Sequence, residues 1–447
     1  MLFRGIAVLN EDFSLTRDMD VCTDGSRIVS ITKADAPDAP GAASFGKPVA
    51  MEAERVIDGT GKLLMPGFYN AHTHLPMTLM RGYGENMLLA DWLEKKIFPF
   101  EDGLTGEDCY HAAMLAMAES FSHGIVSSSD LYIFAEDIIR AATESEAKLN
   151  ASRGLSFFGE ALDTARFKPY QESRKLFRDH HDTQDGRIRV DIALHAEYTA
   201  TPELIEAVAE LSKETGAPVH VHVSETQKEH EECKERNGGR TPARVFADGG
   251  VFDNGGIAAH CVWAEDEDAD ILSEKGVTVV SCPVSNMKLA AGIARIPLLL
   301  DKGVNVALGT DGAASNNNFN FFEEIKLMAL AAKVSFGDPT LITPQEALYA
   351  ATRAGALTQG RADCGIIKEG FRADMLILDL GSPSLNPIYD IANALVFAAS
   401  SRDILMTIVD GVVVYENRSF PTIDVERTIF ETGRARSRIL GGGKAGM

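Results

Sequence analysis

The segment LLMPGFYNAHTH, residues 63–74, places two histidines at the end of an apolar run that is typical of a buried strand. Residues two apart in a strand point to the same side, so His72 and His74 present their imidazoles together. Side-by-side imidazoles are poor packing groups, but their neutral ring nitrogens are good ligands for a divalent metal such as zinc. A pair of hydrogen-bonded loop histidines would give the same tripeptide, so the rest of the chain has to decide between the two interpretations.

Size, charge and cysteine content limit the class of protein. The 447 residues suffice for one large domain and a smaller one. The formal net charge of −22 argues against a nucleic-acid partner, because such binding needs clustered Lys and Arg. The sequence contains neither a secretory signal nor an apolar stretch as long as a membrane helix. Six scattered cysteines without a CxxC pair indicate a reducing compartment. We therefore expect a cytoplasmic protein with no membrane partner, and a homo-oligomer remains open.

Both ends of the chain predict short strands separated by turns. The N-terminal segments cover residues 2–9, residues 20–31 with a hairpin turn at Asp24-Gly25, and residues 55–57. Residues 33–50 between them are typical of an exposed loop. The same pattern returns in residues 373–378 and 406–415. We expect the two ends to build one small β domain, followed by a charged helix from about Val425 and a flexible terminus containing Gly443.

The middle of the chain alternates apolar, β-branched runs with helical patterns, which predicts parallel strands connected by crossover helices. The clearest runs are residues 188–194, 218–223, 256–259, 277–280 and 304–308. About eight such units favour an α/β fold of the (β/α)8 TIM-barrel type over a doubly wound sheet, and no GxGxxG follows the first strand.

Active sites of such barrels lie where the strands end, and this chain places reactive residues there. They are His72, His74, Asp130, Arg153, His195, His222, Glu225, His260, Asn286 and Asp311. Each one alone has a structural explanation: Asp311, for example, would also suit an Asx turn or a helix N-cap. In VHVHV, residues 219–223, only His222 is near enough to the strand end to reach the rim, so we expect His220 to be a core histidine.

Three imidazoles and one carboxylate can hold a single zinc ion and leave a position open for water. Such an ion lowers the pKa of that water to near 7 and supplies hydroxide at neutral pH, which His260 and Asp311 would orient and deprotonate. Glu225 stands in the following loop, where its carboxyl group could transfer protons.

Six longer motifs surround these residues, in a characteristic order. They are PGFYNAHTHLPMTLMRG (66–82), DWLEKKIFPFED (91–102), HVSET (222–226), AHCVW (259–263), SNMKLAAGIARIP (285–297) and LGTDGAASNNN (308–318). The chain resembles the amidohydrolase superfamily, specifically the branch of 5′-methylthioadenosine/S-adenosylhomocysteine deaminases and chlorohydrolase-like proteins. The resemblance covers nearly the whole length.

The resemblance implies a fold and a metal site. The fold is a (β/α)8 barrel over residues 65–369 with a small β-sandwich from residues 1–64 and 370–423, leaving residues 424–447 as a C-terminal helix and tail. The implied metal ligands are His72, His74, His222 and Asp311. Residues 188–194 contain no lysine to bridge a second ion, which favours one Zn²⁺, with Fe²⁺ or Mn²⁺ as alternatives.

The resemblance also assigns roles in catalysis and substrate binding. Glu225 matches the acid that protonates the purine ring, His260 the residue that steers the hydroxide, and Asp311 the base that passes a proton to ammonia. Positions near a nucleoside substrate are Trp92, Glu101, Arg153, Arg166, His195 and Glu225. Ser281 stands where many relatives have histidine, and residues 157–170 depart from the family pattern.

Three hypotheses for the function follow. The first is a hydrolytic deaminase that converts the 6-amino group of a 5′-thio-substituted adenosine, methylthioadenosine or S-adenosylhomocysteine, to the inosine analogue. The second is an aminohydrolase of another ring: guanine or another purine, a pterin, cytosine or a triazine. The third is a non-catalytic binding relative, which would be expected to lack ligands.

Overall fold

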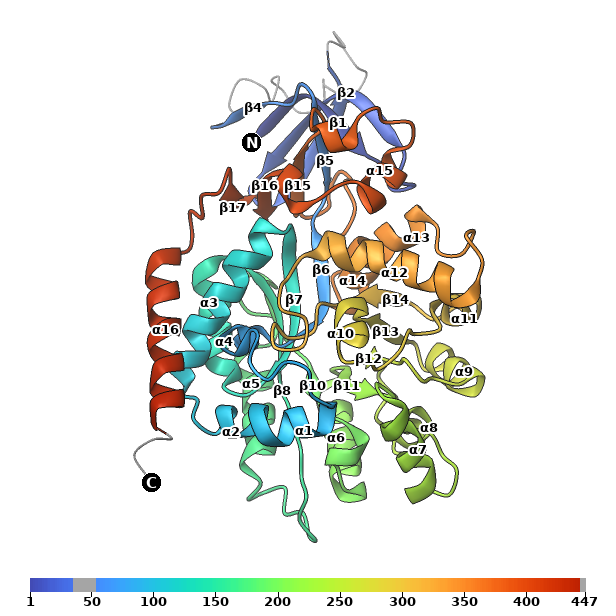
Figure 1. Ribbon diagram of the computed structural model, residues 1–447. Helices are drawn as coiled ribbons and strands as arrows, with labels where there is room; N and C mark the ends of the chain where they lie inside the picture. The colour runs from blue at the N-terminus through green and yellow to red at the C-terminus, as the bar shows by residue number, and fades with distance from the viewer. Residues whose placement is uncertain (35–53, 443–447) are drawn as a thin grey trace.

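The structure is a computed structural model that describes residues 1–34 and 54–442. Most of the loop expected at residues 33–50 and the terminus around Gly443 lie outside the described residues. The structure has an α/β architecture in which parallel strands occupy the middle, helices surround them, and a separate sheet covers one end (Figure 1). None of the described helices has the length and apolar character required to cross a membrane.

The two ends of the chain share one eight-stranded sheet, with the order β17-β16-β15-β5-β1-β2-β3 and β4 beside β1. Figure 1 shows it as blue and red strands side by side. Its strands are β1 (Leu2–Leu9), β2 (Leu15–Asp24), β3 (Arg27–Lys33), β4 (Val56–Asp58), β5 (Lys62–Pro66), β15 (Met375–Asp379), β16 (Ile404–Val409) and β17 (Val412–Glu416). The expected hairpin at Asp24-Gly25 joins β2 to β3.

The central strands form two parallel sheets whose residues are buried almost throughout. One contains β6 (Phe68–Thr73), β7 (Ile125–Tyr132), β8 (Lys148–Arg153) and β9 (Ile188–Val190). The other contains β10 (Ile192–Ala193), β11 (Val219–Val223), β12 (Gly256–His260), β13 (Val277–Ser281) and β14 (Val306–Leu308).

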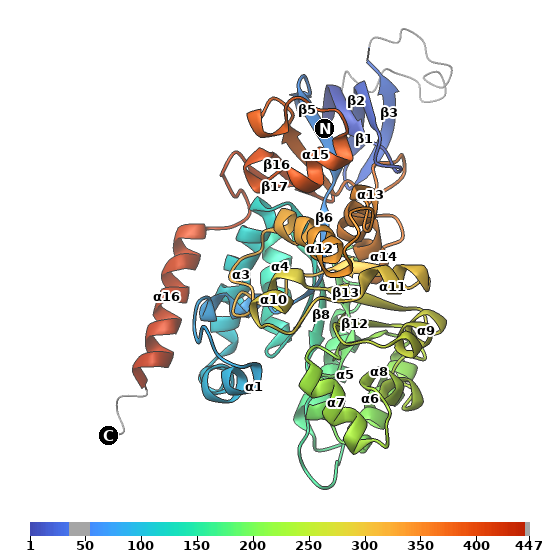
Figure 2. The ribbon, with the colours of Figure 1, turned by 45° about the vertical axis from the view of Figure 1, so that its right-hand side comes forward.

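The helices flank these strands, with α3 and α4 on one side and α7–α9 on the other in both views (Figures 1 and 2). The first eight are α1 (Leu89–Trp92), α2 (Phe98–Glu101), α3 (Gly106–Ser122), α4 (Ala135–Ser145), α5 (Lys168–His180), α6 (Pro202–Thr215), α7 (Gln227–Arg236) and α8 (Pro242–Asp248). The others are α9 (Asp266–Glu274), α10 (Pro283–Lys288), α11 (Ile296–Asp301), α12 (Phe321–Phe336), α13 (Pro344–Tyr349), α14 (Gly355–Thr358), α15 (Ile391–Phe397) and α16 (Val425–Gly442).

Two expected strands are each divided between two sheets. The run at residues 63–71 is not one strand, because the chain leaves the terminal sheet after Pro66 and enters the parallel sheet at Phe68. The run at residues 188–194 is likewise split at Asp191, where hydrogen bonding changes from β8 to β11. Both runs are predominantly apolar on either side of the division, so periodicity could not reveal the change of partner.

The outer strands β6 and β14 are joined by side chains where a ladder of backbone bonds would otherwise run. The Asn70 side-chain amide donates to Thr310 Oγ1 at 2.8 Å, and its Oδ1 accepts the Thr310 backbone N–H at 3.0 Å. The backbone N–H of Asp311 donates to the His72 carbonyl at 3.1 Å. At Gly309 a Cβ atom would lie 2.7 Å from the same carbonyl oxygen, so only glycine permits this approach.

A buried ion-pair network connects the parallel strands to the terminal sheet. The ammonium of Lys148, at the start of β8, donates to the carboxylate of Asp374 and, at 2.7 Å, to Asp410. The Tyr69 hydroxyl also donates to Asp374, at 2.6 Å. Although burial alone would raise the pKa of Asp374, the charge and hydrogen bond of Lys148 lower it. Because these charges are paired, they can remain ionised inside the protein.

Replacing Asn70 tests the junction between β6 and β14. Asn70→Leu keeps the number and branching of the side-chain heavy atoms but leaves the buried backbone N–H of Thr310 without its acceptor. We expect the free energy of unfolding to fall by about 2 kcal/mol, measured by urea denaturation. Asn10→Leu is the control, because the Asn10 amide bonds to Ser14 and Thr16 near the surface. Equal losses in the two variants would contradict the importance of this junction.

Candidate metal centre and substrate pocket

Four of the expected ligands meet at the carboxyl ends of the parallel strands. His72 and His74 come from the end of β6, His222 from β11 and Asp311 from the turn after β14. The side-chain nitrogens of the three histidines lie within 4.8 Å of one another, and a second such group contains His72, His260 and Asp311. All five side chains are buried. The structure therefore brings together residues that are up to 239 positions apart in the sequence.

The spacing of the donor atoms suits one tetrahedral ion. Asp311 Oδ1 lies 3.2 Å from His74 Nε2 and 3.6 Å from His72 Nε2, and the Nε2 atoms of His74 and His222 are 3.4 Å apart. Zinc–ligand bonds of about 2.0–2.1 Å at tetrahedral angles would separate neighbouring ligands by roughly 3.3 Å. His72 Nε2 is buried and has no hydrogen-bond partner. These residues fit a divalent cation.

Each ligand histidine is held through its other ring nitrogen. The Nδ1 contacts are His72 to His220 Nε2 at 2.8 Å, His74 to the Leu131 carbonyl at 2.5 Å and His222 to the His195 carbonyl at 2.7 Å. Partners of this kind fix the tautomer that leaves Nε2 free to bind a metal. His220 was expected to be a core histidine; it is buried, but it contacts a candidate ligand directly.

Asp311 is fixed by three further donors. Its Oδ2 accepts hydrogen bonds from the hydroxyls of Ser285 at 2.6 Å and Ser315 at 2.7 Å, and its Oδ1 accepts the Gly312 N–H at 2.8 Å. Neither serine was expected at the site from the sequence, although both lie within the motifs that begin at residues 285 and 308. Only the fold shows that both hydroxyls reach the same oxygen.

The electrostatics of the cluster favour a cation at its centre. Burial lowers the pKa of His72 to about 3 and that of His222 well below its usual value, so both offer neutral lone pairs. Burial also opposes the charging of Asp311 and His74. Hydrogen bonds from His72 and His74 nevertheless hold the pKa of Asp311 well below its usual range. The hydrogen bond to Asp311 and its negative charge in turn raise the pKa of His74 to about 9. A positive charge beside Asp311 is therefore strongly stabilised.

The cluster opens into a pocket of about 410 Å³, which is large enough for a small ligand. The expected site residues in its wall are Trp92, Glu101, Arg153, His195, Glu225 and His260, together with His74, His222 and Asp311. Arg166, also expected there, does not line the pocket: its side chain is 90% exposed and lies 3.5 Å from Asp163. It stands in the segment 157–170 that departs from the family pattern, where no strand fixes the chain.

Three polar groups in the pocket wall have defined environments. Burial raises the pKa of Glu225, and a backbone contact fixes the chain there because Glu229 accepts the Glu225 N–H at 2.8 Å. His260 is oriented by Asn286, with 2.8 Å between Nδ1 and Oδ1. Burial also raises the pKa of Glu101, whose carboxyl group is near the Tyr132 hydroxyl. Tyr132 is a pocket residue that the sequence did not indicate.

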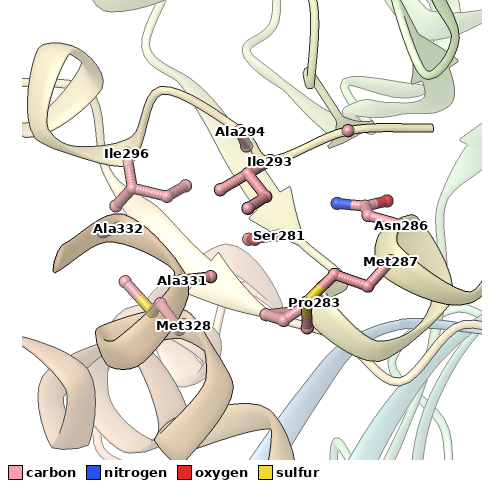
Figure 3. A pocket seen from close by; sticks show the side chains of 11 residues that line it. Ser281, Pro283, Asn286, Met287, Ile293, Ala294, Ile296, Met328, Ala331 and Ala332 are labelled. Carbon is pink, nitrogen blue, oxygen red and sulfur yellow. The ribbon is translucent and has the colours of Figure 1, made fainter. Parts of the chain in front are cut away.

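Ser281 lies in a second, smaller cavity between β13, α10 and α12 (Figure 3). Figure 3 shows Met328 and Ala332 of α12 opposite Ile296. The cavity volume is about 20 Å³, room for roughly one water molecule. Ser281 is therefore not part of the wall of the larger pocket.

A family comparison agrees with this geometry. The model of the amidohydrolase family matches residues 63–414, which include the four candidate ligands and most of the chain. The chain belongs to the amidohydrolase family. The expected hydrolase class is thereby confirmed, as is the likeness to the branch named from the sequence motifs.

Curated relatives and solved structures from the family resemble the chain over most of its length. It is 40% identical over 386 residues to a 5-methylthioadenosine/S-adenosylhomocysteine deaminase of Dictyoglomus thermophilum, covering 86% of this chain and 89% of the relative. It is also 40% identical to a 5′-deoxyadenosine deaminase of Methanosarcina acetivorans, covering 89% and 91%. An adenosine deaminase from Xanthomonas campestris with bound zinc superposes with a TM-score of 0.89 at 28% identity, covering 98% of each chain.

Removal of one ligand tests the metal centre. We expect the wild-type chain to bind about one divalent ion. His222→Asn should bind it at least about 100-fold more weakly, because loss of a direct metal ligand lowers the affinity more than loss of a residue that only orients a ligand. Chelator competition followed by metal analysis measures the affinity. The control is His180→Asn, on the last residue of α5 and outside the cluster. Unchanged affinity in His222→Asn would contradict the assigned ligand set.

Proposed function

We propose that this protein hydrolytically deaminates a 5′-substituted adenosine, such as methylthioadenosine or S-adenosylhomocysteine, to the inosine analogue and ammonia. The observation that carries the proposal is that one pocket combines three candidate metal ligands, His74, His222 and Asp311, with Trp92 and Glu101. The fourth candidate ligand, His72, belongs to the same cluster of donor atoms. Relatives about 40% identical are named for methylthioadenosine, S-adenosylhomocysteine and 5′-deoxyadenosine. The complete ligand set argues against a non-catalytic binding protein.

The architecture that supports this activity is a (β/α)8 barrel. Two features favour closure of the two parallel sheets: the segment 188–193 belongs to both, and Asn70 bridges β6 to β14. We assign this barrel to residues 65–369 and the helix and tail to residues 424–447.

The terminal unit, residues 1–64 and 370–423, we assign to a small sandwich. Its sheet curls on itself, because Ile28 N–H donates to the Phe371 carbonyl and the Ala373 N–H to that of Ser26. Apolar side chains from β1, β3, β5, β15 and β16 share one core inside the curl.

His72, His74, His222 and Asp311 would hold one divalent ion, with Zn²⁺ favoured by the nitrogen-rich ligand set and by the zinc in the related adenosine deaminase. When bound, such an ion lowers the pKa of a coordinated water and so provides a nucleophile at neutral pH. Hydrogen bonds from the neighbouring histidines hold the pKa of Asp311 low, so this carboxylate would serve as the base that takes a proton from the attacking water and passes it to the departing ammonia. His260, held by Asn286, orients the nucleophile toward the ring.

Glu225 would donate a proton to the ring nitrogen next to the carbon under attack. Its burial raises the pKa, which keeps a proton on the carboxyl group at higher pH than in an exposed glutamate. A general acid is most effective when its pKa is near the working pH.

The nucleoside itself would be held by the rest of the pocket wall. Glu101 can accept two hydrogen bonds at once, which suits the adjacent hydroxyls of a ribose. Trp92 provides an apolar surface beside it, with its Nε1 turned toward the Tyr83 carbonyl at 3.4 Å. His195 is neutral because burial lowers its pKa to about 4, so it can hydrogen-bond a purine without adding charge.

Glu225→Gln tests the proton donor. We expect kcat to fall by about 100-fold to 10,000-fold with unchanged metal content, because the amide cannot supply a proton. Steady-state deamination and metal analysis measure the two quantities. The control is Glu235→Gln, an exposed carboxylate on the helix that follows. Equal kcat in wild type and Glu225→Gln would contradict the role.

Glu101→Ala tests the class of substrate. If Glu101 binds the ribose, kcat/KM for methylthioadenosine should fall by at least about tenfold, because that is the loss expected when one hydrogen bond to a charged group is removed. The absorbance change from adenine to hypoxanthine follows the reaction. Unaltered kcat/KM in the variant, or wild-type turnover of guanine, a pterin, cytosine or a triazine but of no 5′-substituted adenosine, would favour an aminohydrolase of another ring.

A further inference from the structure

The pocket wall contains a large apolar area beside the polar groups described above. Leu89 and Leu93 contribute to it, together with Phe98 from α2, Phe158 from the loop after β8 and Pro169 from the start of α5. Phe158 is 77% exposed and Phe98 is 41% exposed, so both keep aromatic surface in contact with solvent. Exposed apolar side chains at the wall of a pocket are stabilised when an apolar ligand group covers them.

The charged lining is dominated by acidic groups. Glu101, Asp102, Glu225 and Asp311 line the pocket, and Arg153 is the single lysine or arginine among its wall residues as described. Arg166 is turned into solvent and lies 3.5 Å from Asp163. A ligand carboxylate entering this pocket would therefore depend on Arg153.

Arg153 is already paired. Its Nε donates to Glu172 Oε2 at 3.0 Å, and its Nη1 donates to the Gly154 carbonyl at 2.5 Å. Glu172, on α5, also lies 3.3 Å from the ammonium of Lys168. The side chain of Arg153 is 18% exposed and that of Glu172 is 40% exposed, so the pair is only partly screened by water.

We propose that this site prefers an adenosine whose 5′ substituent is small and uncharged over one that ends in an amino-acid carboxylate, and that Glu172 sets this preference by pairing with Arg153. The inference rests on the proposed function, because it concerns the substrate of the same pocket. Methylthioadenosine, with its small uncharged 5′ group, is therefore the favoured substrate, and S-adenosylhomocysteine, which ends in an amino-acid carboxylate, is the disfavoured one.

The physical reason is competition for one guanidinium. A substrate carboxylate must either share Arg153 with Glu172, which places two negative charges side by side, or displace Glu172 from it. A methylthio group avoids both costs and covers apolar surface instead. Because a partly exposed ion pair is weak, the resulting preference should be moderate, about tenfold in kcat/KM.

The experiment compares kcat and KM for methylthioadenosine and S-adenosylhomocysteine in metal-loaded wild type and in Glu172→Gln. The proposal expects wild type to favour methylthioadenosine by about tenfold or more. It expects Glu172→Gln to narrow the ratio about fivefold, through a lower KM for S-adenosylhomocysteine, because the amide no longer repels the carboxylate. Arg153→Met combined with Glu172→Gln should abolish this gain, since the two residues act as a pair.

Glu214→Gln is the matched control. Glu214, on α6, pairs at 2.6 Å with Arg174, which lies on α5 as Glu172 does, and Glu214 does not line the pocket. It should leave the substrate ratio as in wild type. Equal or greater wild-type efficiency with S-adenosylhomocysteine, or an unchanged ratio in Glu172→Gln, would overturn the inference while leaving the proposed function intact. Turnover of neither nucleoside would overturn the proposed function, and the inference with it.

Discussion

The junction between the first and last parallel strands is the constraint on which the site depends. Asn70 satisfies both the backbone N–H and the hydroxyl of Thr310, and the Asp311 N–H binds the His72 carbonyl two residues further along β6. These contacts fix the carboxyl end of β14 against that of β6. Asp311 thereby comes within hydrogen-bonding or close contact distance of His72 and His74. Without this junction, the Asp311 carboxylate would lie at the edge of one parallel sheet and the imidazoles of His72 and His74 at the edge of the other.

Bringing these groups together is costly, and the surrounding protein limits the cost. A buried carboxylate without partners would be protonated, whereas Asp311 receives two serine hydroxyls and a backbone N–H. Each ligand histidine has a partner at Nδ1, which holds Nε2 toward the centre. The cluster is thus arranged for a cation before one binds. Such preorganisation is what a metal site requires to bind tightly and in one geometry.

Sequence patterns predicted the features that are local in the chain. His72 lies near the end of β6 and His74 directly after it, and the loop after β11 carries Glu225, so these residues could be recognised from spacing. Patterns could not show that the chain changes sheets at Gly67, because residues before and after it are equally apolar. They also could not place Arg166, whose position depends on a loop and not on a strand end. The roles of Ser285 and Ser315 arise only when two distant turns meet at one carboxylate oxygen.

A single ion at the carboxyl ends of the parallel strands is the central claim, and anomalous X-ray diffraction from crystals of the metal-loaded protein tests it most directly. The account predicts one anomalous peak, within about 2.0–2.2 Å of the Nε2 atoms of His72, His74 and His222 and of Asp311 Oδ1. A peak at other side chains, two peaks of equal height in the cluster, or an ion not bound by Asp311 would contradict it.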